Sequence, residues 1–220
     1  MNLVSSSIPS GWSAFFWLML AGLFFMMWRK TAWRMLLTPA NLNIFLGATV
    51  ILLGFWLIKA GIKPGLNLHL LGATALTLMF RPWFAILSLA IVLAGLTIHN
   101  GQYDAYPANL MLMGVLPVSV SWFLYRLVDS KLPNHFFIYI FINCFFGAAL
   151  ATASVGLATT AYAALSGAYS LSYLLENYAP YYFLMAWAEA FATGMIMTIL
   201  VVYKPEWVAT FDDKRYLQSK

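Results

Sequence analysis

Apolar residues fill most of this chain in blocks separated by short polar or turn-forming stretches. A helix needs about 20 apolar residues to cross a hydrocarbon core of about 30 Å at 1.5 Å per residue. We expect seven such spans, two of them short: Gly11 to Trp28, Asn43 to Ala60, Leu68 to Phe80, Trp83 to Ile98, Asn109 to Leu127, Phe136 to Leu165 and Pro180 to Tyr203. The pattern therefore predicts an all-α fold, a polytopic membrane helical bundle.

The third and fourth spans meet at Arg81-Pro82 and could be misread as one long helix. A charged side chain followed by proline is hard to satisfy in mid-membrane, because proline has no N–H and breaks the helix ladder. We therefore interpret Arg81-Pro82 as a tight loop at a membrane interface between two short spans.

The composition supports this class. The 220 residues are 63% hydrophobic and 9% charged, against about 25% charged in an average soluble domain, and the mean hydropathy is +0.81. We expect a single integral membrane domain over residues 1–220, with an outer segment at 1–10. Residues 204–220 are expected to form a solvated cytoplasmic tail.

Loop charge predicts the orientation, since Lys and Arg accumulate on the cytoplasmic side. If the N-terminus lies outside, ten of the twelve basic residues fall inside: Arg29, Lys30, Arg34, Arg81, Arg126, Lys131, Lys204, Lys214, Arg215 and Lys220. Only Lys59 and Lys63 fall outside. We expect an outer N-terminus and a cytoplasmic C-terminus, and the scattered charges do not form the basic patch that nucleic-acid binding requires.

One carboxylate lies within a predicted span. Glu189 is the sole charge between Tyr181 and Tyr203. A charge at membrane depth costs about 2.5 to 3.5 kcal/mol on insertion scales, so such a residue is a functional-site candidate by default. Thr193 lies one turn further along, where an interhelical hydrogen bond is the simplest interpretation.

Two other polar residues are expected near the outer side. His69 follows a Pro-Gly turn, and a neutral imidazole is a good borderline metal ligand, although a hydrogen bond at a helix interface also fits. Asn109 begins the fifth predicted span, where it either caps that helix or supports a ligand. His99 and His135 are expected in an exposed loop and at the opposite interface.

Catalytic motifs are missing from the sequence. There is no HExxH, GxSxG, GxxxxGK[ST] or GxGxxG, and the aspartates lie in loops or the tail. The single cysteine, Cys144, excludes an intrachain disulfide and a CxxC metal site. We do not expect an enzyme, and energy from ATP would have to enter through a partner.

Four short blocks follow one another in the order of a known family pattern. The start MNLVSSSIPSGW resembles the opening MHIMEGFLPPxW, with Pro9 and Trp12 in register. The stretch HLLGATAL resembles H-x-T-G-x-G-L-G, with His69 and Gly72 matching.

The other two blocks lie further along. Asn109 with Met113-Gly114 resembles G-A-N-x-x-x-M-G, although the following proline comes one residue early, at Pro117. The stretch EAFATG from Glu189, followed by KPE from residue 204, resembles an E-G-x-x-T-G and R-P-E ending. Together the blocks resemble the CbiM/NikM family, the cobalt/nickel-type substrate-binding permeases of energy-coupling factor (ECF) ABC transporters.

This resemblance implies a site and partners. In the family, the metal is held by the N-terminal amine, the first amide nitrogen, a histidine at position 2 and a histidine of the third span, a nitrogen set that suits square-planar Ni(II) or Co(II). On this chain, Met1, Asn2 and His69 occupy those positions. Asn109, Glu189 and Thr193 would support the pocket. The implied substrate is Co(II) or Ni(II), with no cofactor of the chain's own.

The implied partners are an ECF-type transmembrane scaffold subunit and ATP-binding subunits, in a bacterial inner (plasma) membrane. Asn2 departs from the family, since an amide oxygen is a weak, hard donor that does not replace imidazole. A different metal, a metal chelate and an organic solute therefore remain open. So does a non-transporting membrane binding or assembly protein of the same fold.

Overall fold

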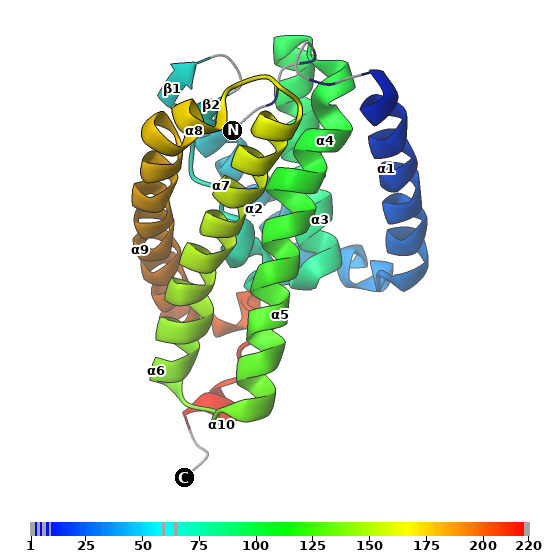
Figure 1. Ribbon diagram of the computed structural model, residues 1–220. Helices are drawn as coiled ribbons and strands as arrows, with labels where there is room; N and C mark the ends of the chain where they lie inside the picture. The colour runs from blue at the N-terminus through cyan, green and yellow to red at the C-terminus, as the bar shows by residue number, and fades with distance from the viewer. Residues whose placement is uncertain are drawn as a thin grey trace.

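The computed structural model describes residues 3, 5, 8, 10–58, 60–63 and 66–217 (Figure 1). Within them, the main helices and strands are α1 (Ser10–Lys30), α2 (Pro39–Leu57), β1 (Ala60–Lys63), β2 (Leu66–Leu68), α3 (Ala73–Asn100), α4 (Tyr106–Leu110), α5 (Leu116–Lys131), α6 (Phe136–Ile138), α7 (Gly147–Leu165), α8 (Leu171–Asn177), α9 (Ala179–Tyr203) and α10 (Asp213–Tyr216). Short 3₁₀ turns lie at Trp33–Leu37, Tyr103–Ala105 and Pro205–Trp207, and π-helical turns at Met111–Val115 and Tyr139–Phe146.

The prediction of a polytopic helical bundle is confirmed. Six helical stretches of the described residues are long and apolar enough to cross a membrane. Their outward faces carry large apolar side chains, with Leu18 74%, Leu157 71% and Phe191 62% exposed. Such a surface is stable in lipid, because a soluble protein rarely exposes apolar patches of this extent.

The longest of these stretches, α3, folds back on itself. Near the start of α2, the Phe45 ring lies 5.5 Å from the ring of Phe80 and 6.1 Å from that of Phe84. Near the end of α2, Leu52 packs against Gly72 and Leu53 against Gly95. Both parts of α3 therefore run beside α2 in opposite directions, and the chain reverses between residues 80 and 84.

The reversal takes place at Arg81, whose φ of 64° and ψ of 168° are not helical. The expected tight turn between two short spans is confirmed, so α3 supplies two of the seven predicted spans. The first of them, residues 73–80, is called the half-helix here; at 1.5 Å per residue it is only about 12 Å long. The seven segments alternate in direction, and α10 lies at the same end of the bundle as the α5–α6 turn (Figure 1).

Several predicted boundaries were wrong. The second span does not reach Ala60, because α2 ends at Leu57 and Ala60 pairs with Leu68 in an antiparallel β1–β2 hairpin. The third span is helical only from Ala73, since Gly72 has a left-handed φ of 65° that stops the helix from extending backwards. The all-α expectation thus misses one small hairpin.

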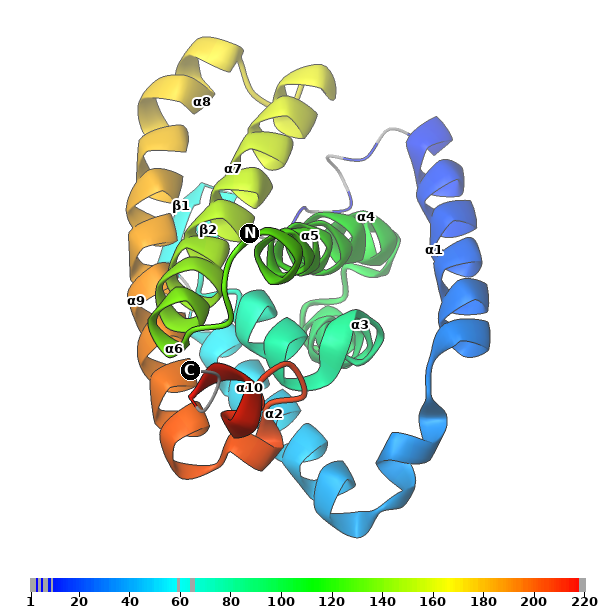
Figure 2. The same cartoon turned by 90° about the horizontal axis from the view of Figure 1, so that it is seen from below.

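Interhelical packing varies across the bundle. α7 approaches α9 closely, because Gly156 leaves room for the Tyr182 ring, which a Cβ would meet at 2.5 Å. By contrast, α1 stands at the edge of the bundle, opposite α9 (Figure 2). It contacts its neighbours through few side chains, among them Trp12, whose ring lies 5.6 Å from that of Tyr162.

The expectation of a solvated tail holds only in part, since residues 212–215 are exposed but other residues of the tail are buried. Val208, Phe211 and Tyr216 are buried against the end of the bundle. The Phe211 ring stacks on Tyr216, with centroids 5.0 Å apart, and meets the Tyr139 ring edge-on at 5.0 Å. Aromatic burial of this kind stabilises a segment that its charged residues alone suggested was solvated.

We expect Arg81→Gly to stabilise the protein by about 1 kcal/mol. The Arg81 backbone lies in a region that only glycine adopts freely, at a cost on the order of 1–3 kcal/mol, part of which the greater unfolded-state freedom of glycine offsets. Thermal unfolding in detergent micelles measures the change. The control is Arg126→Gly, at an exposed position inside α5, which we expect to lose about 1 kcal/mol. Equal losses for both variants would contradict the strain at Arg81.

Candidate functional site

Asn109 holds the N-terminal segment of the chain. Its side-chain Oδ1 accepts the Leu3 N–H at 2.8 Å, and its Nδ2 donates to the Leu3 carbonyl oxygen at 3.1 Å. A second clamp follows, in which the Ser5 N–H donates to Oε1 of Gln102 at 2.7 Å. Leu3 and Asn109 are both buried, so this pairing replaces the water that an extended backbone would otherwise bind.

The capping alternative for Asn109 is wrong. α4 begins at Tyr106, after Ala105, and Asn109 lies inside it with no bond to the helix start. Gln102 could not be singled out from the sequence, because a glutamine in a loop between two spans carries no signal of its own. Only the fold brings Asn109 and Gln102 against residues 97 or more positions earlier in the chain.

His69 lies between β2 and the half-helix, and it is buried, with 4% of its surface exposed. Its ring packs on the Trp56 indole with centroids 4.4 Å apart. The Nδ1 atom is 3.1 Å from the Leu70 carbonyl oxygen. If Nδ1 carries the proton and donates to that carbonyl, Nε2 is the ring nitrogen that would ligate a metal.

Trp56 also fixes the backbone next to His69. Its indole N–H donates to the Leu71 carbonyl oxygen at 3.2 Å, and its side chain is 1% exposed. The same tryptophan therefore packs on the imidazole and orients the irregular chain that follows it. A tryptophan near the end of a span gave no sign of this role in the sequence.

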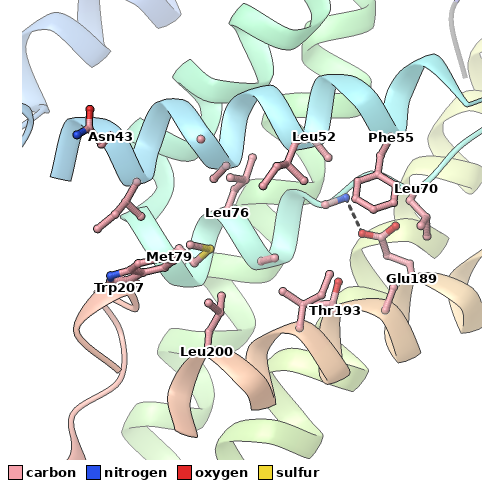
Figure 3. A pocket seen from close by; sticks show the side chains of 18 residues that line it. Asn43, Leu52, Phe55, Leu70, Leu76, Met79, Glu189, Thr193, Leu200 and Trp207 are labelled. Atoms are coloured by element: carbon pink, nitrogen blue, oxygen red, sulfur yellow. Dashed lines mark hydrogen bonds between the residues drawn. The ribbon is translucent and has the colours of Figure 1, made fainter. Parts of the chain in front are cut away.

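Glu189 binds the irregular segment from the opposite side. Its Oε2 accepts the Leu71 N–H at 2.7 Å. Its Oε1 accepts the Gly72 N–H at 2.6 Å (Figure 3). Thr193, one turn further along α9, is in hydrogen-bonding contact with the carboxylate. The carboxylate thus lies at the N-terminal end of the half-helix, where backbone N–H groups lack partners and the helix dipole favours negative charge.

Gly72 is needed for this arrangement. Its φ is 65°, and a Cβ built on it would lie 2.6 Å from the Leu52 side chain. Both the backbone conformation and the space exclude a side chain there. The Gly72 N–H therefore meets Glu189 with α2 packed directly behind it.

Other predicted residues are not tested by this geometry. Met1 and Asn2 lie outside the described residues. Among the side chains that the structure describes, no group of three or more His, Cys, Asp or Glu residues could hold a metal ion. A metal at His69 would therefore need further donors such as backbone nitrogens. His99 and His135 are exposed.

A cavity of about 520 Å³ lies between α2, the half-helix and α9 (Figure 3). Its walls are mainly apolar, including Leu52, Phe55 and Leu76, and Glu189 contributes the only carboxylate. His69 and Asn109 do not line it. The cavity offers no ligand set for a metal ion, because the described residues that line it include a single carboxylate and no His or Cys side chain.

We expect Glu189→Gln to destabilise the protein by about 1–3 kcal/mol. The new NH₂ group would face one of the two backbone N–H donors, which leaves a buried donor without an acceptor. Thermal unfolding measures the loss, with Glu176→Gln, an exposed glutamate of α8, as the matched control. Unfolding temperatures equal to that of the unchanged protein in both variants would refute the role of Glu189.

Comparisons with known proteins agree with this architecture. Residues 2–207 match the model of the family CbiM, described as the cobalt uptake substrate-specific transmembrane region. A comparison with curated proteins found no match. A solved structure of a truncated transition metal transporter is similar, with a TM-score of 0.80 and 18% identity over 92% of this chain and 99% of that one. A second, of a transition metal transporter, has a TM-score of 0.78 and 18% identity over 91% and 92%.

At 18% identity the solved structures support the fold alone. The family model, by contrast, covers nearly the whole sequence, including the blocks around His69, Asn109 and Glu189. The chain therefore belongs to the CbiM family of transmembrane metal-uptake proteins.

Proposed function

We propose that this chain is the substrate-capture subunit of an ECF-type transporter and that it takes up a transition-metal ion of the cobalt/nickel type. The ion binds from the outer side, between His69 and the N-terminal segment. The chain has no ATP-binding motif of its own. A transmembrane scaffold and ATP-binding subunits, in a bacterial inner membrane, therefore supply the energy.

The burial of His69 is the observation that carries the proposal. A buried imidazole with Nδ1 beside a carbonyl oxygen and a Trp56 ring against one face is held in one orientation. Metal-ligating histidines commonly donate their other ring N–H to such a group. The imidazole is also placed next to irregular backbone, which in membrane proteins lines substrate sites.

The clamp on Leu3 supports the same site. Asn109 pairs with both the N–H and the carbonyl of Leu3, so the chain is anchored two residues after Met1. Consecutive Cα atoms lie about 3.8 Å apart, which limits how far Met1 and Asn2 reach from this anchor. A ligand set drawn from the N-terminal amine and an amide nitrogen therefore needs the anchor that Asn109 supplies.

Asn2 bears on the choice of metal. The family's second imidazole is replaced by an amide, so the nitrogen set loses one strong donor. We expect binding of Ni(II) and Co(II) through Met1, the residue-2 amide nitrogen and His69. The site should discriminate between the two metals less strongly than a site with two imidazoles does.

We expect His69→Ala to lower the affinity for Ni(II) and Co(II) by about 100-fold or more, since loss of a ligand should exceed the 10–100-fold typical of supporting residues. The measurement is metal titration of the purified full chain with a free N-terminal amine. His99→Ala, which changes an exposed histidine, is the matched control and should bind as the unchanged protein does. Asn109→Ala should lose about tenfold by releasing Leu3.

Two results would overturn the proposal. One is that the unchanged protein binds neither metal under conditions in which it is folded. The other is that His69→Ala binds both metals as tightly as His99→Ala does.

A further inference from the structure

The last carbonyl groups of the half-helix have no donor within their own helix. In an α-helix, the Leu78 carbonyl would accept from the N–H of residue 82, but residue 82 is proline and has none. The Met79 carbonyl would accept from Trp83, which lies beyond the break at Arg81. Both Leu78 and Met79 are buried, and a buried carbonyl without a donor costs about 1–3 kcal/mol.

The C-terminal strap, defined as residues 204–217, supplies the missing donors. The Thr210 hydroxyl donates to the Leu78 carbonyl oxygen at 2.7 Å, and the Ala209 N–H donates to the Met79 carbonyl oxygen at 3.0 Å. These bonds join residues about 130 positions apart. The strap therefore completes the helix end that Pro82 leaves open.

Thr210 is itself held from two sides. The Tyr139 hydroxyl lies 2.8 Å from Thr210 Oγ1, and because the threonine proton is given to Leu78, Tyr139 is the donor. The Tyr125 hydroxyl donates to the Thr210 carbonyl oxygen at 3.3 Å.

An ion pair anchors the end of the strap. Arg215 pairs with Asp129 of α5, 2.5 Å away. Together with the buried rings of Phe211 and Tyr216, this pair fixes the strap to α5 and to the π-helical turn before α7.

The other end of the half-helix leads to the proposed metal site. Gly72 and Leu71 are bonded to Glu189, and His69 lies two residues before Leu71. Most residues of the half-helix are buried, with Leu76 and Met79 facing the cavity, and a helix of about two turns shifts as one rigid body rather than bending. Its position along its axis is set by Glu189 at one end and by Thr210 at the other.

We propose that Thr210 is a positioning residue for metal binding: through the half-helix, the docked strap sets where His69 lies. The inference rests on the proposed function, because it needs a metal at His69. It gives the tail a role in metal binding, although the tail meets the end of the half-helix that lies away from His69. Release of the strap from Leu78 and Met79 lets the half-helix move and lowers the affinity at His69.

Metal titration of three variants tests the proposal. Thr210→Val keeps the side-chain shape but removes the donor to Leu78, and we expect it to lower the Ni(II) affinity by about five- to tenfold. Thr210→Ser keeps the hydroxyl and should restore the affinity. Thr198→Val is the matched control, because the Thr198 hydroxyl donates only to Gly194 of its own helix, and it should bind like the unchanged protein.

The affinity is measured below the unfolding temperature of each variant, together with the visible absorption spectrum of bound Ni(II). A purely structural role of Thr210 would lower the unfolding temperature and leave both affinity and spectrum unchanged, which would overturn the proposal. Loss of binding in His69→Ala with unchanged binding in Thr210→Val defeats this inference alone. Unchanged binding in His69→Ala defeats the proposed function instead.

A measurement on the unchanged protein tests the proposal even if the Thr210→Val variant does not fold. If strap docking favours metal binding, metal binding must favour strap docking by the same factor. Hydrogen exchange of residues 208–216, which include the Ala209 amide bonded to Met79, should therefore slow when Ni(II) is added. Equal exchange with and without Ni(II) in a protein that binds the metal would overturn the proposal.

Discussion

In a bilayer, a backbone N–H or carbonyl group has no water to bind, and each unpaired one costs several kcal/mol. This constraint explains much of the structure around the half-helix. The chain between β2 and α3 is irregular at Leu71 and Gly72, and the helix breaks again at Arg81-Pro82. Glu189 supplies acceptors at the first interruption, and the C-terminal strap supplies donors at the second.

The same constraint explains why α9 and the strap act together. Glu189 lies near the middle of α9 and Thr210 lies in the strap that follows it, so one continuous segment reaches both ends of the half-helix. A charged residue within a span and a threonine in a hydrophilic tail thus serve one purpose, which is to pair backbone groups that helix geometry leaves open.

Polar pairing also connects the N-terminal segment with the interior. The Asn109 side chain bonds to the Leu3 backbone as a neighbouring strand would, through one donor and one acceptor. A side-chain amide has the right complement of groups for this task. The metal site that we propose therefore lies where two irregular segments, around Leu3 and around His69, are each paired by residues from helices.

The apolar blocks and the Arg81-Pro82 dipeptide were enough to predict the helical bundle and its internal reversal, because lipid admits few alternatives to helices and proline cannot continue one. Glu189 could also be singled out, since a carboxylate in an apolar stretch is costly. Its partners could not, because Leu71 and Gly72 offer backbone N–H groups that every residue has. The place of the tail was likewise decided by tertiary structure: Thr210 donates to Leu78 across 132 positions, and only the packed bundle brings that carbonyl within its reach.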